Sequence, residues 1–403
     1  MFDEVKEGEV AADNHEILWK IHVIKAGDTL NAADVAVLLE AAKHPDPKVQ
    51  KQAILAIKSH IPYFSEDQHA NQAFQTAFKD VFEDVFNTLI DWIQTNADQE
   101  ESTKAMQAIR RLVSHFTKDQ CNAEVFNKAF NTLILISKNK AQQINVRQEA
   151  METITELIPH FPEDQRNEEA FKAVVDTLLL ISKDQEEESN VRKAAVWALG
   201  QLVKHLPADQ CGAVVDTLIL ISNNQAEQIN VRQTAVQALG QLKATDTKHD
   251  EVLTVLKQNA SQKTGQNWEV RQTAVQALGQ LVKHLPADQC GEVVDTLILI
   301  SKDQAEESNV RQTAVQALGQ IFEQLPADKL REVVDTLIPI SKDQAEQINV
   351  RREAVAIFQK TGLPWLKLVD ENQKSLIVAT FLGLVDDPDQ YIRDSASFVM
   401  FST

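Results

Sequence analysis

A unit of about 40 residues recurs along the chain, and this repetition limits the possible folds more than any other feature. The segment that begins at Val270 (VRQTAVQALGQLVKHLPADQCGEVVDTLILISKDQ) is almost identical to the one that begins at Val191 (VRKAAVWALGQLVKHLPADQCGAVVDTLILISNNQ). Val-Arg pairs open such segments at Val146, Val191, Val231, Val270, Val310 and Val350, which by subtraction are 45, 40, 39, 40 and 40 residues apart. Weaker copies begin at Val49, Glu101 and Ile392. Units of this length predict a helical array in which each unit buries its apolar side against its neighbours.

Each unit contains two amphipathic helix patterns. The first follows the Val-Arg pair, and its apolar residues recur at helical spacing: Val270, Ala274, Ala277, Leu278, Leu281 and Leu285. The second follows a Leu-Pro-Ala-Asp sequence, where proline suits the start of a helix. Asn309 and Asn349 directly precede Val-Arg pairs, and we expect them to cap the helices that begin there. With only 11 Gly and 11 Pro in 403 residues, helix breakers are rare, and the sequence predicts an all-α chain.

Paired helices in which one helix opens with Val-Arg-x-x-Ala-x-x-Ala-Leu resemble HEAT repeats, and the resemblance extends from about Val49 to the C-terminus. It implies an all-α, right-handed α-α superhelix, a HEAT-type solenoid of about eight helical pairs, with the Val-Arg helices along its concave side. We expect an N-terminal helical cap in residues 1–48 and longer, Phe-rich repeats in residues 49–190. Regular repeats should fill residues 191–349, and a C-terminal repeat and cap residues 350–403.

The arginine of the Val-Arg pair recurs in nearly every unit. A column of guanidinium groups can bind carboxylates of a partner. The resemblance to HEAT repeats implies instead a structural ladder, in which each arginine reaches an acidic residue of a neighbouring unit. The candidate acceptors are Asp184, Asp303 and Asp343, or Asp176, Asp216, Asp295 and Asp335. We therefore expect Arg271 to bond to an aspartate or a backbone carbonyl near the turn of an adjacent unit.

The outward side of the Val-Arg helices is the candidate binding surface. With the valine as position one, positions three and seven form a polar and mostly uncharged stripe. The candidate protein-binding residues are Lys51, Gln107, Gln148, Glu152, Lys193, Trp197, Gln233, Gln237, Gln272, Gln276, Gln312 and Gln316. Rows of amides can bind the backbone of an extended peptide, although glutamine is also a good solvated helix former, and both interpretations stay open.

Trp197 stands in a row that elsewhere contains glutamine, so we expect it to anchor a partner. Lys193 and Glu152 would orient a charge of that partner beside the ring. The alternative is that the indole packs over a neighbouring helix.

The chain carries 40 basic and 59 acidic residues, a formal net charge of -19. Such a surface repels nucleic acid and attracts a basic or polar protein or peptide, or it serves only to keep a long array in solution. An alternative function, a nucleic-acid-modifying enzyme similar to HEAT-like glycosylases, requires a basic groove that this charge disfavours.

No catalytic, metal or cofactor site is expected. The sequence contains no Gly-x-Ser-x-Gly, Gly-rich phosphate loop or Cys-x-x-Cys motif. Four units carry a histidine at the same position, His115, His160, His205 and His284, and helices 8–10 Å apart cannot bring one histidine per unit to a shared zinc ion. We therefore expect a non-enzymatic interaction scaffold or adaptor that binds a protein on its concave helix face.

The sequence also bears on location. No run of about 18 apolar residues occurs, and the opening segment is acidic, so we expect a cytoplasmic chain without membrane insertion. Near-identical copies indicate recent duplication, which suits an adaptor, for example an effector of a host-interacting bacterium. The oligomeric state stays open.

Overall fold

The computed structural model describes residues 14–25, 32–60, 85–94, 99–114, 123–161, 169–206, 208–242, 248–263, 267–282, 285, 287–361 and 371–402. Within these ranges the chain is helical or forms short connections, and no strand is present. Backbone contacts divide the chain into two compact units, Met1–Pro207 and Ala208–Thr403, here called unit 1 and unit 2. The division into four sequence regions stays a prediction.

The helices occur in pairs. Unit 1 contains helical residues 14–25 and 85–94 and the helices α2 (Ala32–Ala42), α3 (Pro47–His60), α5 (Gln99–Ser114), α6 (Ala123–Lys138), α7 (Ile144–Leu157), α8 (Glu169–Lys183) and α9 (Ser189–Leu202). Unit 2 contains α10 (Ala208–Asn223), α11 (Ile229–Leu239), α12 (His249–Ser261), α13 (Trp268–Leu281), α14 (Ala287–Lys302), α15 (Ser308–Ile321), α16 (Ala327–Lys342), α17 (Ile348–Thr361), α18 (Glu371–Leu384) and α19 (Gln390–Ser402). Short 3-10 turns follow α7, α9 and α15 at Ile158–His160, Val203–His205 and Phe322–Gln324.

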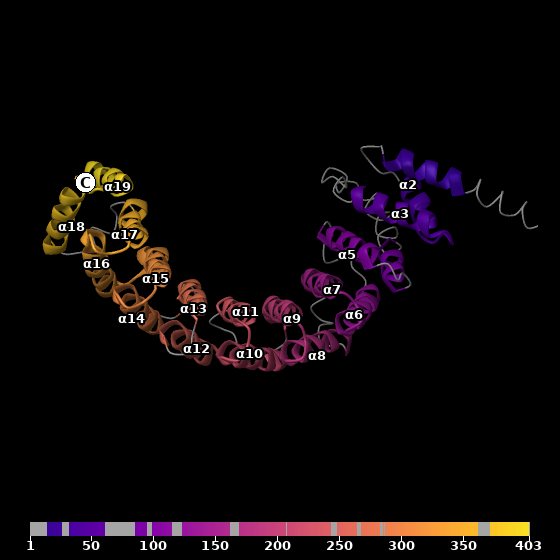
Figure 1. The fold of residues 1–403 in the computed structure, drawn as a ribbon, viewed down its shortest axis with the longest axis horizontal. Helices are drawn as coiled ribbons and strands as arrows, with labels where there is room; N and C mark the ends of the chain where they lie inside the picture. Colours follow the sequence, from indigo (N-terminus) through magenta and orange to yellow (C-terminus); the bar gives the residue numbers. More distant parts are fainter. Residues whose placement is uncertain are drawn as a thin grey trace, which may run out of the picture. The chain divides into compact units, whose positions relative to one another are not determined.

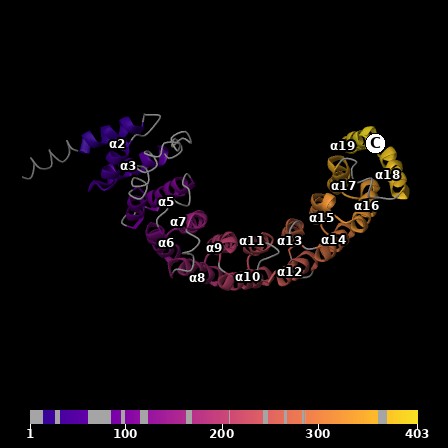
Figure 2. The same ribbon diagram turned by 180° about the vertical axis from the view of Figure 1, so that it is seen from behind.

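Each unit consists of two layers of helices. In unit 2 the Val-Arg helices α11, α13, α15, α17 and α19 form the inner layer of a curved stack, and α10, α12, α14, α16 and α18 form the outer layer (Figures 1 and 2). In unit 1, α5, α7 and α9 form one layer and α6 and α8 the other. The predicted all-α solenoid is confirmed. The described residues form four helical pairs in unit 1 and five in unit 2, close to the predicted number.

Small residues bring the inner helices of unit 2 together. A Cβ atom added at Gly240, the residue directly after α11, would lie 2.5 Å from the Cβ of Ala277 on α13, and one at Gly279 of α13 would lie 2.8 Å from the Cβ of Ala317 on α15. The outer helices bury Val, Leu and Ile and contact one another less extensively than the inner helices do. Because helix separation follows the size of the side chains at the contact, this difference bends unit 2 toward its Val-Arg layer.

Arginines join successive repeats through buried ion pairs. Arg147 reaches Glu187 at 2.5 Å in unit 1, and in unit 2 Arg271 reaches Glu306 at 2.7 Å and Arg311 reaches Glu346 at 2.5 Å. Arg351 likewise bonds to Asp387. The expected ladder between neighbouring repeats is confirmed, and the carboxylate that Arg271 contacts belongs to a glutamate rather than to an aspartate.

The predicted acceptor aspartates were wrong, and the turn geometry explains why. Asp184, Asp303 and Asp343 each accept a backbone N–H from the residue two positions later, at 3.0, 3.0 and 2.9 Å, so their carboxylates close the turn. The second set lies on the outer layer, where Asp216 pairs with Lys248 and Asp295 with Lys329. Asp176 is exposed on α8 and Asp335 accepts from Gln373 on α18, so neither bonds to a Val-Arg arginine.

The ladder glutamates also begin the next helix. The carboxylate of Glu306 accepts the backbone N–H of Glu307 at 2.8 Å, one residue before α15 begins. Asn309 and Asn349 therefore lie inside the first turn of α15 and α17, and the prediction that they cap these helices was wrong. Glu306 thus bonds both to Arg271 of the previous repeat and to the backbone at the start of α15. This couples the formation of the α15 helix to the stacking of the two repeats.

Candidate protein-binding surface

The side chains at position three join neighbouring Val-Arg helices. In unit 2 the amide of Gln272 donates to the hydroxyl of Thr313 at 3.1 Å, Gln233 donates to Thr273 at 3.5 Å, and Asn349 donates to Gln312 at 2.8 Å. In unit 1 the amide of Gln148 donates to the carbonyl of Asn190 at 3.1 Å. These predicted binding residues already have partners within the fold, which leaves them less free to bind a ligand.

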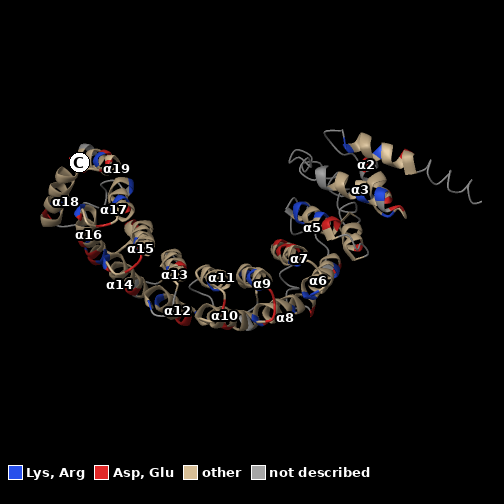
Figure 3. Cartoon of the chain, in the orientation of Figure 1, with Lys and Arg blue, Asp and Glu red and all other residues tan. Residues whose placement is uncertain are grey.

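The side chains at position seven in unit 2 are different. Gln237, Gln276 and Gln316 lie on the exposed side of α11, α13 and α15, and they make no hydrogen bond within the described part of the chain. Gln280 and Gln320, one turn further along α13 and α15, are exposed as well. Most of α11, α13 and α15 carries no charge, whereas α12, α14 and α16 of the outer layer carry many (Figure 3). Unit 2 therefore presents an uncharged row of free amides along its inner face.

The predicted residues of unit 1 lie among ion pairs. Lys51 on α3 pairs with Glu101 on α5 at 2.8 Å, and Lys104 pairs with the same carboxylate at 2.9 Å. Burial raises the pKa of Glu101, but hydrogen bonds from the two lysines outweigh it and leave that pKa below its usual range. Glu152 accepts from Arg110 at 2.9 Å, so it does not provide the free charge that was expected beside Trp197.

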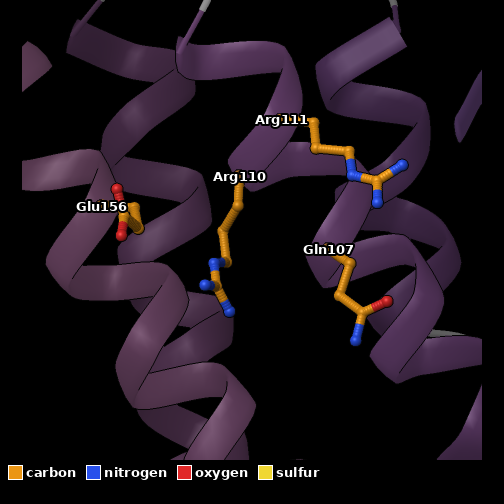
Figure 4. Close-up of a pocket in the computed structure, with 4 residues that line it drawn as sticks. All are labelled: Gln107, Arg110, Arg111 and Glu156. Atoms are coloured by element: carbon orange, nitrogen blue, oxygen red, sulfur yellow. The ribbon is translucent and has the colours of Figure 1, made fainter. Parts of the chain in front are cut away.

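A pocket of about 480 Å³ lies between α5 and α7, lined by Gln107, Arg110, Arg111 and Glu156 (Figure 4). Arg110 extends between the two helices, and its guanidinium donates to Glu149 and Glu152, both at 2.9 Å. The charge of Arg110 is therefore balanced by two glutamates, and Glu156 adds a further carboxylate to the pocket lining, so the pocket is not the basic groove that a nucleic-acid-modifying enzyme requires.

Trp197 on α9 is half-buried, and Lys193 lies one turn before it on the same side of the helix. Lys193 is exposed and makes no ion pair within the described ranges. Part of the indole is thus accessible beside a free cation, which keeps both the anchoring role and the packing role of this ring open to test.

Sequence reasoning missed one aromatic residue of the same row. Phe398 is position seven of the weak copy that begins at Ile392, and its side chain is 53% exposed on α19. Extending the alignment to this last copy would have found it. Nearby, Arg352 pairs with Asp389 and lies over the ring of Tyr391 at 6.0 Å, and Arg352 holds the pKa of the Asp389 carboxyl below its usual range.

The outer layer carries a second unpredicted feature, a leucine at one position of several repeats that is more than 60% exposed. These residues are Leu135, Leu180, Leu220 and Leu299. In α12 the same position is Gln258 and in α16 it is Pro339, so the leucines form no unbroken row in unit 2.

Among the residues that the structure describes, no group of three or more His, Cys, Asp or Glu side chains is arranged to hold a metal ion. Nor is any described helix long and apolar enough to cross a membrane.

Comparison with known proteins agrees with this geometry. The family model for the adaptin N terminal region matches residues 73–284, and a HEAT repeat model matches residues 261–347. No curated protein is a significant sequence match.

Solved structures share the fold at low identity. Importin beta is 14% identical with a TM-score of 0.63, over 91% of this chain and 46% of that chain. Kap121p is 15% identical with a TM-score of 0.57, over 91% of this chain and 37% of that chain, and one of its structures has the extreme C-terminus of the protein phosphatase Cdc14p bound. The chain thus spans less than half the length of these karyopherins. Because the adaptin model covers more than half of the chain, this HEAT-repeat protein belongs to the adaptin N-terminal region family.

Proposed function

We propose that this protein is a non-catalytic scaffold that binds a segment of another protein along the exposed side of its Val-Arg helices. The observation that carries the proposal is the row formed by Gln237, Gln276 and Gln316, which is exposed and uncharged and makes no hydrogen bond among the described residues. An amide both donates and accepts hydrogen bonds, so a row of amides matches the alternating N–H and C=O groups of an extended backbone.

The spacing of the row supports an extended segment. Packed helices lie about 8–10 Å apart, and the close approach at Gly240 and Gly279 places the inner helices near the lower end of that range. A chain in the polyproline II conformation advances about 9 Å in three residues. Every third residue of such a segment would therefore meet a glutamine of the next repeat, whereas the two-residue period of a β-strand would not match.

The net charge of -19 favours a polar or basic segment over nucleic acid, because long-range attraction raises the rate of encounter. The row itself is uncharged, so its hydrogen bonds would add affinity without selecting a charge. Kap121p, a solenoid of the same fold, has been crystallised with protein segments bound, which supports a protein partner for this chain.

The test begins with affinity capture of partners by the full chain, followed by measurement of the affinity of the captured segment. We expect Gln237→Ala/Gln276→Ala/Gln316→Ala to weaken binding at least tenfold, about 1.4 kcal/mol. The variant should keep its helix content, because alanine has the highest helix propensity. Gln258→Ala on the exposed side of α12 is the matched control and should bind like the wild type. Wild-type affinity in the triple variant would mean that the row is solvated surface only.

A further inference from the structure

The last turn of α7 carries a carboxylate that no described residue neutralises. Glu156 is exposed and makes no ion pair or hydrogen bond within the described ranges. The other two glutamates of this helix, Glu149 and Glu152, both accept from Arg110. Glu156 also lines the pocket of about 480 Å³ between α5 and α7, where Arg110 lies between Glu156 and Arg111 (Figure 4). A cation of a partner can therefore reach Glu156 from the exposed side without displacing an existing ion pair.

The next Val-Arg helix, α9, carries the opposite charge beside an aromatic ring. Lys193 is exposed and makes no ion pair in the part of the chain that the structure describes. Trp197 lies one turn later on the same side and is half-buried. The other charged side chain of α9, Arg192, is buried and donates to the backbone carbonyl of Glu187, and the helix contains no acidic residue. The exposed side of α9 therefore offers one cation and one apolar surface.

The packing of α7 against α9 sets the order of these three groups. The starts of the two helices lie together, because the amide of Gln148 on α7 donates to the carbonyl of Asn190 on α9 at 3.1 Å. Glu156, Trp197 and Lys193 therefore follow one another diagonally, from the last turn of α7 to the first turn of α9. With helices about 8–10 Å apart and a rise of about 1.5 Å per residue, the backbones at Glu156 and Trp197 are about 10 Å apart, and those at Trp197 and Lys193 about 6 Å.

We propose, resting on the proposed function, that this part of unit 1 selects a protein segment in which an apolar residue has a basic residue on one side and an acidic residue on the other. The apolar side chain packs on Trp197, the cation pairs with Glu156 and the carboxylate pairs with Lys193. A segment in the polyproline II conformation advances about 3 Å per residue. The basic residue therefore stands about three positions from the apolar residue, and the acidic residue about two positions from it.

This site supplies the selectivity that the glutamine row of unit 2 lacks. The amides of that row can bond to the backbone of any extended segment, so they do not distinguish one sequence from another. Glu156 and Lys193 attract a segment with the matching order of charges and repel one in which both charges are reversed. Trp197 adds an apolar contact of a kind enriched at binding hot spots, at a position where four other repeats have glutamine.

Selection of a phage-displayed library of random peptides on the full chain tests this assignment. We expect the enriched peptides to share an apolar residue with a basic residue on one side and an acidic residue on the other, at the spacing given above. Selection on Lys193→Glu should replace the acidic residue by a basic one, and selection on Glu156→Lys should replace the basic residue by an acidic one. Lys172→Glu, which reverses an exposed lysine on the outer helix α8, is the matched control and should select the same peptides as the wild type.

The affinity of one selected peptide gives the size of the effect. Lys193→Glu should weaken binding at least tenfold, and replacing the acidic residue of the peptide by lysine should restore binding to that variant, because opposite charges meet again. Circular dichroism checks that each variant keeps its helices. No enriched peptide, or the same peptides from Lys193→Glu as from the wild type, would overturn the proposal.

The outcome also separates this site from the glutamine row. The charge order together with wild-type affinity in Gln237→Ala/Gln276→Ala/Gln316→Ala would support the site in unit 1 and contradict the row in unit 2. Enriched peptides that lack the charge order and lose affinity in that triple variant would support the row and contradict the selection by Glu156 and Lys193.

Discussion

Replacing Gly279 by alanine tests whether glycine sets the separation of the inner helices. The new methyl carbon would lie 2.8 Å from the Cβ of Ala317 and 3.4 Å from its Cα. Carbon atoms in contact prefer about 3.5–4.0 Å, so α13 and α15 would have to move apart by a substantial part of an ångström. Overpacking of this kind costs about 1–3 kcal/mol, whereas replacing a helical glycine by alanine gains up to about 1 kcal/mol.

We therefore expect Gly279→Ala to lower the free energy of unfolding by about 1 kcal/mol net. Gly240→Ala should cost more, because its Cβ would meet the backbone Cα of Ala277 at 2.8 Å as well as the Cβ. Gly212→Ala on α10 is the matched control. Nothing lies within 4 Å of its added Cβ, so only the gain in helix propensity should remain.

Urea unfolding followed by circular dichroism measures the three midpoints. The double variant Gly279→Ala/Ala317→Gly should recover most of the loss, because it moves the methyl group to the other helix instead of adding one. If Gly279→Ala stabilises the protein as Gly212→Ala does, the inner helices are not held close by glycine, and this explanation of the curvature in unit 2 is wrong.

Three further predictions concern buried groups. Arg311→Met should destabilise the protein by about 3–5 kcal/mol in urea unfolding, because it leaves Glu346 buried and unpaired, whereas Arg311→Met/Glu346→Met should lose much less. The hydrogen bond from Arg147 lowers the pKa of Glu187. The stability that this carboxylate contributes is therefore present above the usual glutamate pKa and is lost as the pH falls through the lowered pKa. Glu187→Gln should flatten this acid dependence of the urea midpoint. Cys211 and Cys290 are buried, and burial raises the pKa of the Cys290 thiol. A thiol reagent should therefore label both cysteines only after unfolding. Rapid labelling of these cysteines in the native protein would contradict their buried position.

The sequence predicted the fold well because the repeats share the same spacing of apolar and small residues. Val-Arg followed by small residues at fixed spacing identified one layer of helices, and the second pattern identified the other. The existence of the arginine ladder was also predictable. Its acceptor was not, because Asp303 and Glu306 lie three residues apart in one turn and only the backbone shows that Asp303 closes the turn while Glu306 faces the previous repeat.

The sequence predicted which positions form the candidate surface. It could not predict which of these side chains are hydrogen-bonded or ion-paired within the fold. Whether Gln272 is free depends on the register between α13 and α15, which places Thr313 within reach of its amide. Gln276, one turn later, has no such neighbour and stays free. The pairing of Glu152 with Arg110 depends in the same way on how α5 and α7 align.

The affinity of a captured partner for Trp197→Gln tests most directly whether partners bind the exposed side of the Val-Arg helices. Glutamine occupies this position in four other repeats, so the variant should keep its fold and helix content. Leu180→Gln on the outer helix α8, where the leucine is 64% exposed, is the control for loss of apolar surface. If the partner binds the exposed side of the Val-Arg helices, Trp197→Gln weakens binding at least tenfold, about 1.4 kcal/mol, and Leu180→Gln leaves it unchanged. Unchanged affinity in Trp197→Gln together with a loss in Leu180→Gln would place the binding surface on the outer layer and contradict the proposal.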